Sequence, residues 1–465
     1  MSKLGRIRAL ILAVLIGSVL WSVVFLAHFN KNSLRIADNV AQFGPVCEVC
    51  TADQADLLWR RYNRSCSERL DPPLPRFAIT LKSPSQPFNT SNEEFEVTRA
   101  AGRDANIIAK GFQGALRALD AACGAAPEFV RKTPAPRALP YRGLLLDISH
   151  VFLSVTELMR ILEFASKEAG LNVIHLHITD NQCFGIELDD APELAHQSRG
   201  ACNRGSKVRG YYTRNELKDL SKVAASMGVV IMIELDIPGH AGAWKMSHPE
   251  HVVQDYLDPE SGSMWQLLST VLTELDDVLP VTPLRTELPL GLHLGGDEVS
   301  NSRAYRAFEA KLKNYRPRHI QTHNLRWEES LLVGGVEEND IVTVWKSYEM
   351  AGRILLEDVV AQGFKAINMC LSRLYLDAKF QPTVQAIGKF DAFRSGSQTP
   401  GRNGRLIGKD REHLVIGAAV SCWGECMTDL AKDLSGERAY ADFWDLVREA
   451  GNNFWHTERP SQRGA

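Results

Sequence analysis

Short apolar runs alternate with amphipathic stretches along the chain from Tyr141 onward. Apolar runs bounded by turn residues indicate buried strands, and apolar positions three and four residues apart indicate helices. The predicted strands cover residues 143–147, 172–178, 228–235, 291–294, 341–345, 365–369 and 414–421, and the first predicted helices cover residues 156–169 and 214–227. Strands that alternate with helices form a parallel sheet. The length of the pattern and the lack of a GxGxxG loop favour a (β/α)8 TIM barrel over a doubly wound sheet.

A different pattern precedes the barrel. Strands are predicted at residues 76–81, 94–98 and 105–109, followed by a helix at residues 114–123. The chain divides near the sequence Thr133-Pro-Ala-Pro-Arg137. We therefore expect a small α+β domain over residues 40–135 and a barrel domain over residues 138–460.

The N-terminus has the pattern of a membrane segment. Residues 9–29 contain no Asp, Glu, Lys or Arg, and this length is enough to cross a bilayer as a helix. Lys3, Arg6 and Arg8 lie in a predicted cytoplasmic tail of residues 1–8, which favours a type II signal anchor. A cleaved signal peptide, with a secreted or lysosomal product, is the alternative. In both cases the rest of the chain lies in the secretory pathway or outside the cell.

Composition adds little that is specific. The chain has 465 residues, 45% hydrophobic and 23% charged, and a net charge of -3 without a basic cluster, so we expect no nucleic-acid partner. Sequons at Asn63 and Asn89 fit a lumenal glycoprotein.

Nine cysteines, an odd number, leave at least one thiol without an intramolecular partner. Cys183 and Cys202 bracket one loop and are the best candidates for a disulfide, because an oxidising lumen favours pairing. The four cysteines before residue 130 can pair among themselves. The Cys47-x-x-Cys50 spacing is half of a zinc motif, but no second half follows it, so we expect no metal or cofactor.

Polar residues follow nearly every predicted strand of the barrel. Catalytic groups of such barrels lie at the carboxyl ends of the strands. The residues at these positions are Asp147, His177, Asp180, Asp236, His240, Asp297, Glu298, Trp345, Trp423 and Glu425. So many carboxylates, imidazoles and indoles on one rim are hard to explain by packing, and they predict an active site there.

The sequence Gly295-Gly-Asp-Glu298 carries the most information. Adjacent side chains on an extended segment point to opposite sides, so Asp297 and Glu298 meet different environments. One carboxyl group can then be protonated while the other is ionised, which is the division of roles used in glycoside hydrolysis.

The motifs together resemble one family. They are Arg142-Gly-Leu-Leu-Leu-Asp-Ile-Ser149, His175-Leu-His-Ile-Thr-Asp180, Ile233-Glu-Leu-Asp-Ile-Pro-Gly-His240, His293-Leu-Gly-Gly-Asp-Glu-Val299 and Cys422-Trp-Gly-Glu425. In order and spacing the chain is similar to the family 20 glycoside hydrolases, the β-N-acetylhexosaminidases. The resemblance implies a retaining exo-hydrolase that removes terminal β-linked GlcNAc or GalNAc from glycoconjugates, with a homodimer as a common assembly.

The resemblance also implies roles for individual residues. The 2-acetamido oxygen of the sugar attacks its own anomeric carbon, and an oxazolinium ion forms. Glu298 is then the general acid and base, and Asp297 orients the acetamide. Asp180 and His240 form a relay to Glu298. The implied sugar-binding residues are Arg142, Trp345, Trp423 and Glu425, whereas for His177 and Asp236 a structural role is an equal alternative.

Two positions depart from the family pattern. Leu374 stands where a Trp is usual, and the Tyr that donates to the acetamide oxygen is not identifiable in residues 390–411, where we expect it. A missing donor weakens transition-state stabilisation. A specificity-shifted enzyme and a non-catalytic glycan-binding descendant therefore remain alternatives.

The predicted anchor is testable by extraction. If residues 9–29 are retained as a membrane helix, the full-length protein should stay in the membrane pellet after alkaline carbonate treatment, because a spanning helix is not released by breaking ionic contacts. A mature N-terminus beyond Phe29, with the protein in the supernatant, would contradict the anchor.

Overall fold

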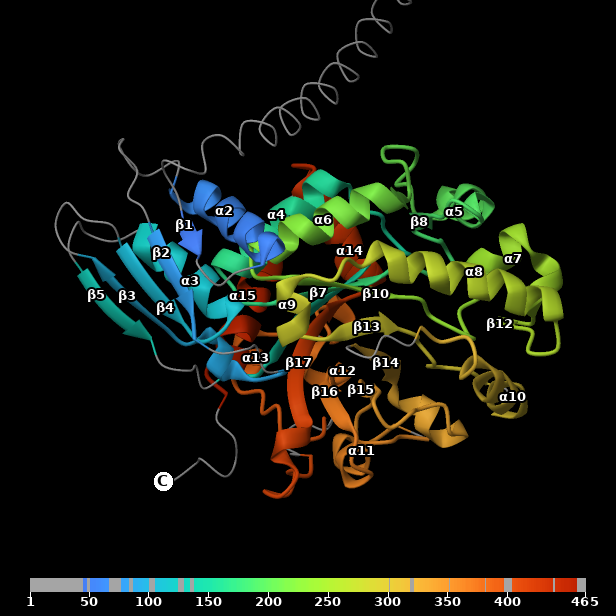
Figure 1. The fold of residues 1–465 in the computed structure, drawn as a ribbon. Coiled ribbons are helices and arrows are strands. Elements are labelled where there is room, and N and C mark those ends of the chain that lie inside the picture. Colours follow the sequence, from blue (N-terminus) through green and yellow to red (C-terminus); the bar gives the residue numbers. More distant parts are fainter. Residues whose placement is uncertain are drawn as a thin grey trace, which may run out of the picture.

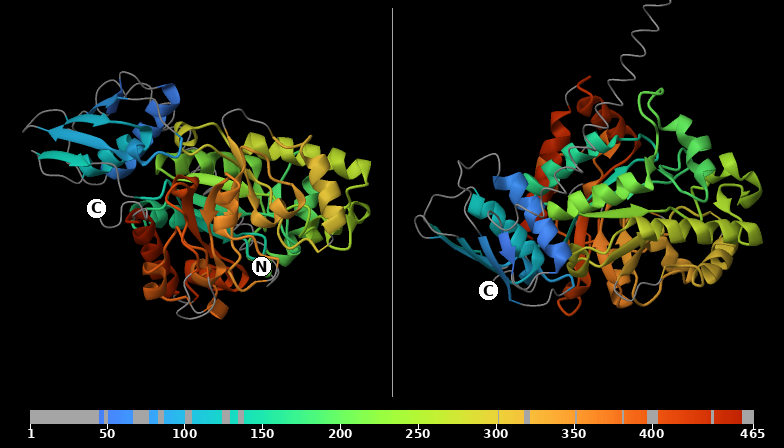
Figure 2. Two further views of the ribbon diagram at one scale, coloured as in Figure 1. Left: turned by 90° about the horizontal axis from the view of Figure 1, so that it is seen from below. Right: turned by 45° about the horizontal axis from the view of Figure 1, so that its top comes forward.

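The computed structural model places two folded parts side by side (Figures 1 and 2). It describes residues 45–47, 51–66, 77–82, 87–99, 105–123, 129–133, 138–300, 302–317, 322–350, 352–380, 382–396, 404–437 and 440–457. One part is a small sheet with helices, and the other is a closed barrel.

The small part contains a five-stranded sheet in the order β1-β2-β4-β3-β5. Its strands are β1 Pro45–Cys47, β2 Phe77–Leu81, β3 Phe95–Arg99, β4 Ala105–Ala109 and β5 Phe129–Thr133, and its helices are α2 Ala52–Cys66, η1 Thr90–Glu93 and α3 Phe112–Cys123. The three predicted strands and the predicted helix are present. β1, α2 and β5 were not predicted, and β1 and β5 both lie at edges of the sheet, where the burial signal of a strand is weakest.

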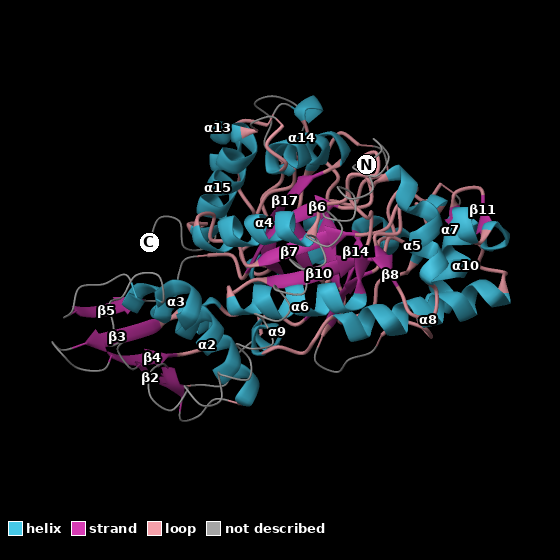
Figure 3. Cartoon of the chain, turned by 90° about the horizontal axis from the view of Figure 1, so that it is seen from above, coloured by secondary structure: helices cyan, strands magenta, loops and turns pink. Residues whose placement is uncertain are grey.

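The second part confirms the predicted barrel. Eight parallel strands close in the order β10-β13-β14-β15-β16-β17-β6-β7. They are β6 Tyr141–Asp147, β7 Val173–His177, β10 Val230–Glu234, β13 Leu290–His293, β14 His323–Trp327, β15 Ile341–Val344, β16 Lys365–Asn368 and β17 Val415–Cys422. Figure 3 shows helices surrounding these strands.

The helices around the barrel begin where the sequence supplies caps. Ser154 and Thr213 each accept from the backbone of a Glu three residues on, which completes a capping box at α4 and α6. The helices are α4 Val155–Lys167, α5 Pro192–Ser198, α6 Arg214–Ser226, α7 Gly242–Ser247, α8 Gly262–Val278, α9 Pro283–Glu287, α10 Ser302–Leu312, α11 Leu356–Ala361, α12 Leu371–Leu374, α13 Val384–Gly388, α14 Gly424–Leu434 and α15 Ala441–Trp455.

Shorter elements lie in the loops between these helices and strands. Two small ribbons pair β8 Ile186–Glu187 with β9 Tyr212–Thr213, and β11 Val252–Val253 with β12 Tyr256–Leu257. The 3-10 turns are η2 Arg199–Ala201, η3 Pro249–His251, η4 Glu328–Val333, η5 Ala378–Phe380 and η6 Glu412–Leu414.

The sequence analysis did not predict one barrel strand, β14. Its sequence, HNLRW, carries a cation where a buried strand usually carries an apolar side chain. In the structure Arg326 is fully buried and forms an ion pair with Glu309 of α10. Arg326 also donates to the Leu294 carbonyl. A buried cation needs such partners, and these are visible only in three dimensions.

The disulfide predicted between Cys183 and Cys202 is present, with Cα atoms 6.2 Å apart. Two further disulfides join Cys66 to Cys123 and Cys422 to Cys426, and Cys370 is free and buried. The side chain of Cys47 and the whole of Cys50 lie outside the described residues.

The predicted anchor, residues 9–29, also lies outside the described residues. No helix within the described part of the chain is both long and apolar enough to span a bilayer. Of the two sequon residues, Asn89 is exposed and its side chain caps η1, whereas Asn63 lies within α2.

The prediction that Arg142 binds sugar is wrong. Arg142 begins β6, at the end of the barrel opposite the carboxyl ends of the strands, and only 2% of it is exposed. Its guanidinium lies 3.0 Å from Glu93 of the small domain, donates to the Leu139 and Gly170 carbonyls and stacks on Trp455. Arg142 therefore joins the two parts of the molecule.

We expect Arg142→Met to lower the free energy of unfolding by about 3 kcal/mol, because Glu93 would keep a buried charge with fewer partners. Urea denaturation measures this loss, and Glu93→Gln combined with Arg142→Met should cost less than the sum of the single changes. Arg60→Met is the matched control. It breaks an exposed pair with Asp56 and should cost less than about 0.5 kcal/mol. An equal loss in both variants would refute the joining role of Arg142.

Candidate active site

A buried carboxylate, that of Glu234, lies inside the barrel at the end of β10. One oxygen accepts from the Trp327 indole at 2.7 Å, and the other lies 2.8 Å from His175 and 3.0 Å from His177. His293 is 3.3 Å away. Burial opposes ionisation of Glu234, but these imidazoles outweigh it and hold its pKa well below the usual range.

The three histidines differ in charge. Burial lowers the pKa of His175, and it lowers the pKa of His293 to about 4, so both rings are neutral at physiological pH. For His177 burial also favours the neutral ring, but the charge of Glu234 and a hydrogen bond to Asp180 raise its pKa well above the usual value. His177 therefore carries the positive charge that Glu234 requires.

Opposite charges then alternate toward the mouth of the barrel. Asp180 lies 3.4 Å from His177 and 2.9 Å from Nδ1 of His240, and these two partners lower its pKa despite burial. Burial disfavours the His240 cation, but Asp236 and Asp180 raise the pKa of His240 to about 11. The predicted connection from Asp180 through His240 to Glu298 is therefore present, with 3.7 Å between His240 Nε2 and Glu298 Oε2.

Two glycines bring the end of β13 close to β10. A Cβ at Gly295 would lie 1.9 Å from Asp236 Oδ1, and a Cβ at Gly296 would lie 2.2 Å from the Ser330 hydroxyl. Both glycines have positive φ, as do His240 and Glu298, at 53° each. Non-glycine residues in this conformation are strained, and such strain gathers at functional sites.

The adjacent carboxylates do meet different environments, as predicted, but Asp297 is the one whose carboxyl group is buried. Burial and the nearby charge of Asp236 raise its pKa well above the usual value. Its Oδ1 atom is buried without a hydrogen-bond partner in the described part of the chain. The side chain of Glu298 is 60% exposed and faces the solvent at the mouth. Asp297 thus offers an unpaired acceptor and Glu298 an accessible acid.

Trp345 and Trp423 lie at the rim, as predicted. The Trp345 indole donates to Glu329 at 3.1 Å, and Glu329 also accepts from the backbone N–H of Glu298. The Trp423 ring packs edge-on against His177, with 5.0 Å between ring centroids. Trp345 is therefore linked to Glu298 through Glu329, and Trp423 lies beside the charged cluster at His177.

Tyr375 is a site residue that the sequence analysis missed. It comes directly after the short helix α12, which follows β16, and it was not among residues 390–411, where a tyrosine was expected. Its ring lies 5.9 Å from that of Trp423, and burial together with the charges of Asp297 and Glu328 raises its pKa well above the usual value. Leu374, beside it, is fully buried in the core. Tyr375 thus places a hydroxyl-bearing ring beside Trp423, one residue after the position that departs from the family pattern.

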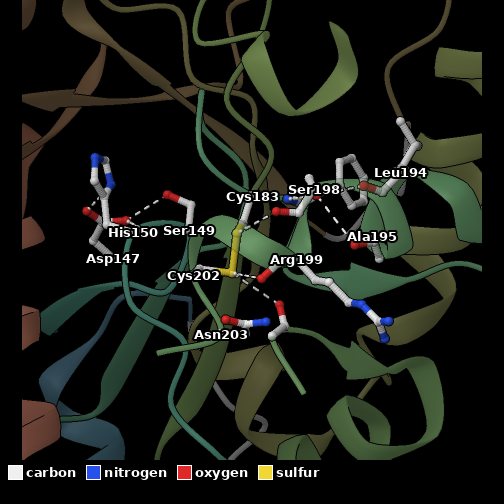
Figure 4. Close-up of a disulfide and its surroundings, with 12 residues drawn as sticks. Asp147, Ser149, His150, Cys183, Leu194, Ala195, Ser198, Arg199, Cys202 and Asn203 are labelled. Atoms are coloured by element: carbon white, nitrogen blue, oxygen red, sulfur yellow. Dashed lines mark hydrogen bonds and ion pairs between the residues drawn. A yellow bond between two sulfur atoms is a disulfide. The ribbon is translucent and has the colours of Figure 1, made fainter. Parts of the chain in front are cut away.

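His150 is a second residue that was missed. It lies in the loop after β6, 2.6 Å from Asp147 and 3.9 Å from Asp180, and one third of its side chain is exposed. Burial lowers its pKa, but Asp147 and Asp180 raise it to a net value above the usual one. Figure 4 shows this pair beside the Cys183–Cys202 disulfide. The signal in the sequence was its position three residues after the strand-end Asp147.

His175 lies in the core and points to the same interior side as His177, because side chains two apart on a strand share a face. Glu425 is exposed in the first turn of α14 and makes no hydrogen bond or ion pair that the structure records. It lines a cavity with Thr428 and Tyr440, and its role in sugar binding stays a prediction.

Three groups of histidines and carboxylates lie close enough together to hold a metal ion: His175, Glu234 and His293; His177, Glu234 and Asp236; and Asp236, His240 and Asp297. The shortest contacts in the first two, 2.8 and 3.0 Å, are hydrogen-bond distances. The structure records these contacts as ion pairs between Glu234 and the imidazoles.

The fold and the site together define a barrel protein with a carboxylate pair at the mouth, which is the layout of many glycoside hydrolases. The sequence model described as "Glycosyl hydrolase family 20, catalytic domain" matches residues 139–321 and 305–435. This covers more than half of the chain, so the chain belongs to glycosyl hydrolase family 20.

Relatives agree with this assignment. "Beta-hexosaminidase 1" of Arabidopsis thaliana is 26% identical over 369 residues, 73% of this chain and 60% of that protein. "Beta-hexosaminidase A" of Caenorhabditis elegans is 25% identical over 433 residues, 81% of this chain and 72% of that protein. The chain thus spans about 60% of the plant relative.

Solved structures support the fold. The family 20 β-N-acetylhexosaminidase of Streptomyces coelicolor aligns with a TM-score of 0.65 at 18% identity, over 91% of this chain and 88% of that one. The Streptomyces plicatus N-acetyl-β-hexosaminidase in complex with Thio-NAglucal aligns with a TM-score of 0.63 at 20% identity, over 91% and 87%.

The raised pKa of His240 gives a pH-dependent stability. Its folded pKa, about 11, exceeds the unfolded value of about 6.5, so its stabilising effect is complete below about pH 6.5 and is lost as the pH rises toward 11. The difference in unfolding free energy between wild type and His240→Asn should therefore shrink by more than about 1 kcal/mol between about pH 6 and pH 9.

Urea denaturation at both pH values measures this difference. His413→Asn, which changes an exposed histidine at η6, is the control and should show a small difference at both. A His240→Asn difference that stays constant with pH would show that His240 is not held as a cation.

Proposed function

We propose that this protein is a retaining β-N-acetylhexosaminidase that removes terminal β-linked N-acetylhexosamine by substrate-assisted catalysis. The observation that carries the proposal is the contrast between neighbouring carboxyl groups. Asp297 presents a buried, unpartnered oxygen, and Glu298 presents an accessible carboxyl group within 3.7 Å of His240. The family membership and the names of the relatives support the same activity.

In the first step the acetamide oxygen of the sugar attacks C1, and the bond from C1 to the leaving-group oxygen breaks. Glu298 gives its proton to that oxygen. The acetamide N–H donates to the free oxygen of Asp297, which aligns the attack, and an intramolecular nucleophile has a high effective concentration. The product of this step is an oxazolinium ion.

The raised pKa of Asp297 in the empty site fits this step. Positive charge develops on the ring beside it, and a nearby cation favours the ionised carboxylate. The developing charge therefore stabilises the ionised form of Asp297, and the attraction between the two is strongest in the transition state. An interaction that strengthens in the transition state raises kcat.

In the second step water adds to C1 and the oxazolinium ring opens. Glu298, now ionised, accepts a proton from that water, and the sugar leaves with retained configuration. His240, held as a cation between Asp180 and Glu298, stabilises the ionised state of Glu298. The Tyr375 hydroxyl is the donor for the acetamide oxygen, and Trp345 and Trp423 flank the sugar ring.

The preference between GlcNAc and GalNAc depends on the residues around the sugar's far hydroxyls. We assign that role to His150 and Asp180, which lie together at the mouth, rather than to Arg142. A specificity-shifted activity is the second candidate, because these two residues and the exposed Glu425 leave this side of the mouth open. The natural setting that we propose is a membrane-anchored, lumenal domain.

The carboxylate pair can be separated by mutation. Glu298→Gln should abolish turnover of substrates with poor leaving groups and retain part of the activity on activated aryl glycosides, whose oxygens need little protonation. Asp297→Asn should lower kcat on both substrates by roughly a hundredfold or more, because it weakens acetamide attack. Steady-state kinetics on chromogenic β-GlcNAc and β-GalNAc glycosides measure these effects.

A glycoside without the 2-acetamido group is the control substrate. A wild-type protein that hydrolyses a plain β-glucoside efficiently would rule out the substrate-assisted mechanism. A wild-type protein that hydrolyses neither N-acetylhexosaminide would point instead to a non-catalytic glycan-binding protein.

A further inference from the structure

The strand order fixes which side of the mouth faces each end of a bound sugar. In the closed order of eight strands, β17 lies four strands from β13 in both directions, so it is diametrically opposite. Glu298, after β13, must lie beside the leaving-group oxygen on C1. The C3, C4 and C6 positions of the same ring therefore point across the barrel, toward β17, β6 and the helix α14.

A large cavity lies on that opposite side. It has a volume of about 690 Å³ and lies between His150, the loop that contains Arg204 and Lys207, and α14 with Thr428 and Lys432. We call it the α14 groove. A second cavity of about 230 Å³, which contains Glu425, shares the wall at Thr428. Figure 4 shows the Cys183–Cys202 disulfide, which holds the loop beside His150.

The α14 groove is larger than a substituent such as sulfate requires. Small-molecule sites typically have volumes of roughly 300–1,000 Å³. The groove therefore has room for a whole sugar residue attached to the one at the catalytic pair. It begins at His150, which lies 3.9 Å from Asp180, so the two regions adjoin.

The basic side chains of the groove are paired. Among the described residues, Arg204, Lys207 and Lys432 line the groove, and their carboxylate partners are Glu157, Glu437 and Asp429. Arg204 is held by Glu157, but the side chains of Lys207 and Lys432 are 63% and 43% exposed beside single carboxylate partners. An ammonium group has three donors, so both lysines can bind a second anion.

We infer that the α14 groove binds an acidic sugar attached to the C3 or C4 hydroxyl of the N-acetylhexosamine, so that the protein releases an acidic disaccharide in addition to a terminal N-acetylhexosamine. This rests on the proposed function, since Glu298 defines the leaving-group side. The reaction is the same hydrolysis, with one water consumed for each bond broken. The carboxylate of the second sugar lies against Lys207 and Lys432, and its ring occupies the space above Thr428.

Four aryl glycosides test the inference: N-acetylglucosamine, its 6-sulfate, and two disaccharides in which the sugar on N-acetylglucosamine is glucuronic acid or glucose. We expect kcat/KM for the acidic disaccharide to exceed that for the neutral one about fivefold at low salt, and the ratio to fall as salt screens the lysines. Lys432→Glu should abolish this preference.

The matched control is Lys222→Glu. Lys222 of α6 pairs with an Asp three residues earlier, as Lys432 does, but lies away from the groove, so this change should leave the ratio unaltered. Equal rates for the two disaccharides, or failure to cleave either while N-acetylglucosamine is cleaved, would overturn the inference. A gain for the 6-sulfate with inert disaccharides would also overturn it, because the groove would then bind only a small anion.

If the proposed function itself is wrong, the same experiment gives a different result. If none of the four glycosides is hydrolysed, calorimetric titration of the wild type with the free acidic and neutral disaccharides decides the inference separately. Tighter binding of the acidic disaccharide that Lys432→Glu removes would support the groove, and equal or absent binding would refute it.

Discussion

The ionised carboxylate of Glu234, buried at the centre of the barrel, is the constraint on which the site depends. A charge in that position is tolerated only with close partners, and Trp327, His175 and His177 supply them from two other strands. The charge of Glu234 raises the pKa of His177, which is therefore a cation. This cation in turn helps to lower the pKa of Asp180. The order of charges at the mouth is therefore set from the interior outward, before any ligand is bound.

This chain of charges ends at a strained segment. Gly295 and Gly296 allow the end of β13 to touch Asp236, and Glu298 follows with a positive φ. The strained turn places Asp297 inward, where burial raises its pKa, and Glu298 outward, near the cation of His240. Two chemically similar side chains thus acquire different properties through backbone geometry, which is what a substrate-assisted mechanism requires of them.

In the proposed complex, the barrel also separates the two ends of the substrate. Because β13 and β17 are opposite, the acid and the α14 groove lie on opposite sides of the mouth. The loops that form the groove are held by a disulfide and by ion pairs, such as that of Arg204 with Glu157, that do not involve the catalytic residues. Specificity can therefore change in these loops while the central cluster, and with it the chemistry, stays the same.

The sequence by itself determined the barrel, the small domain before it and the carboxylate pair at a strand end, because strand periodicity and strand-end positions are local properties. The relay of Asp180 and His240 was implied by the resemblance of their motifs to the family. Only the tertiary structure placed Arg142 between the domains, because its partner Glu93 is 49 residues away. It also revealed β14. The cation of Arg326 is typical of a loop in the sequence, and only its ion pair with Glu309 explains how it can be buried in a strand. Tyr375 could be recognised as a site residue only in the structure, because barrel closure, and not the spacing of residues along the chain, decides which strand ends meet.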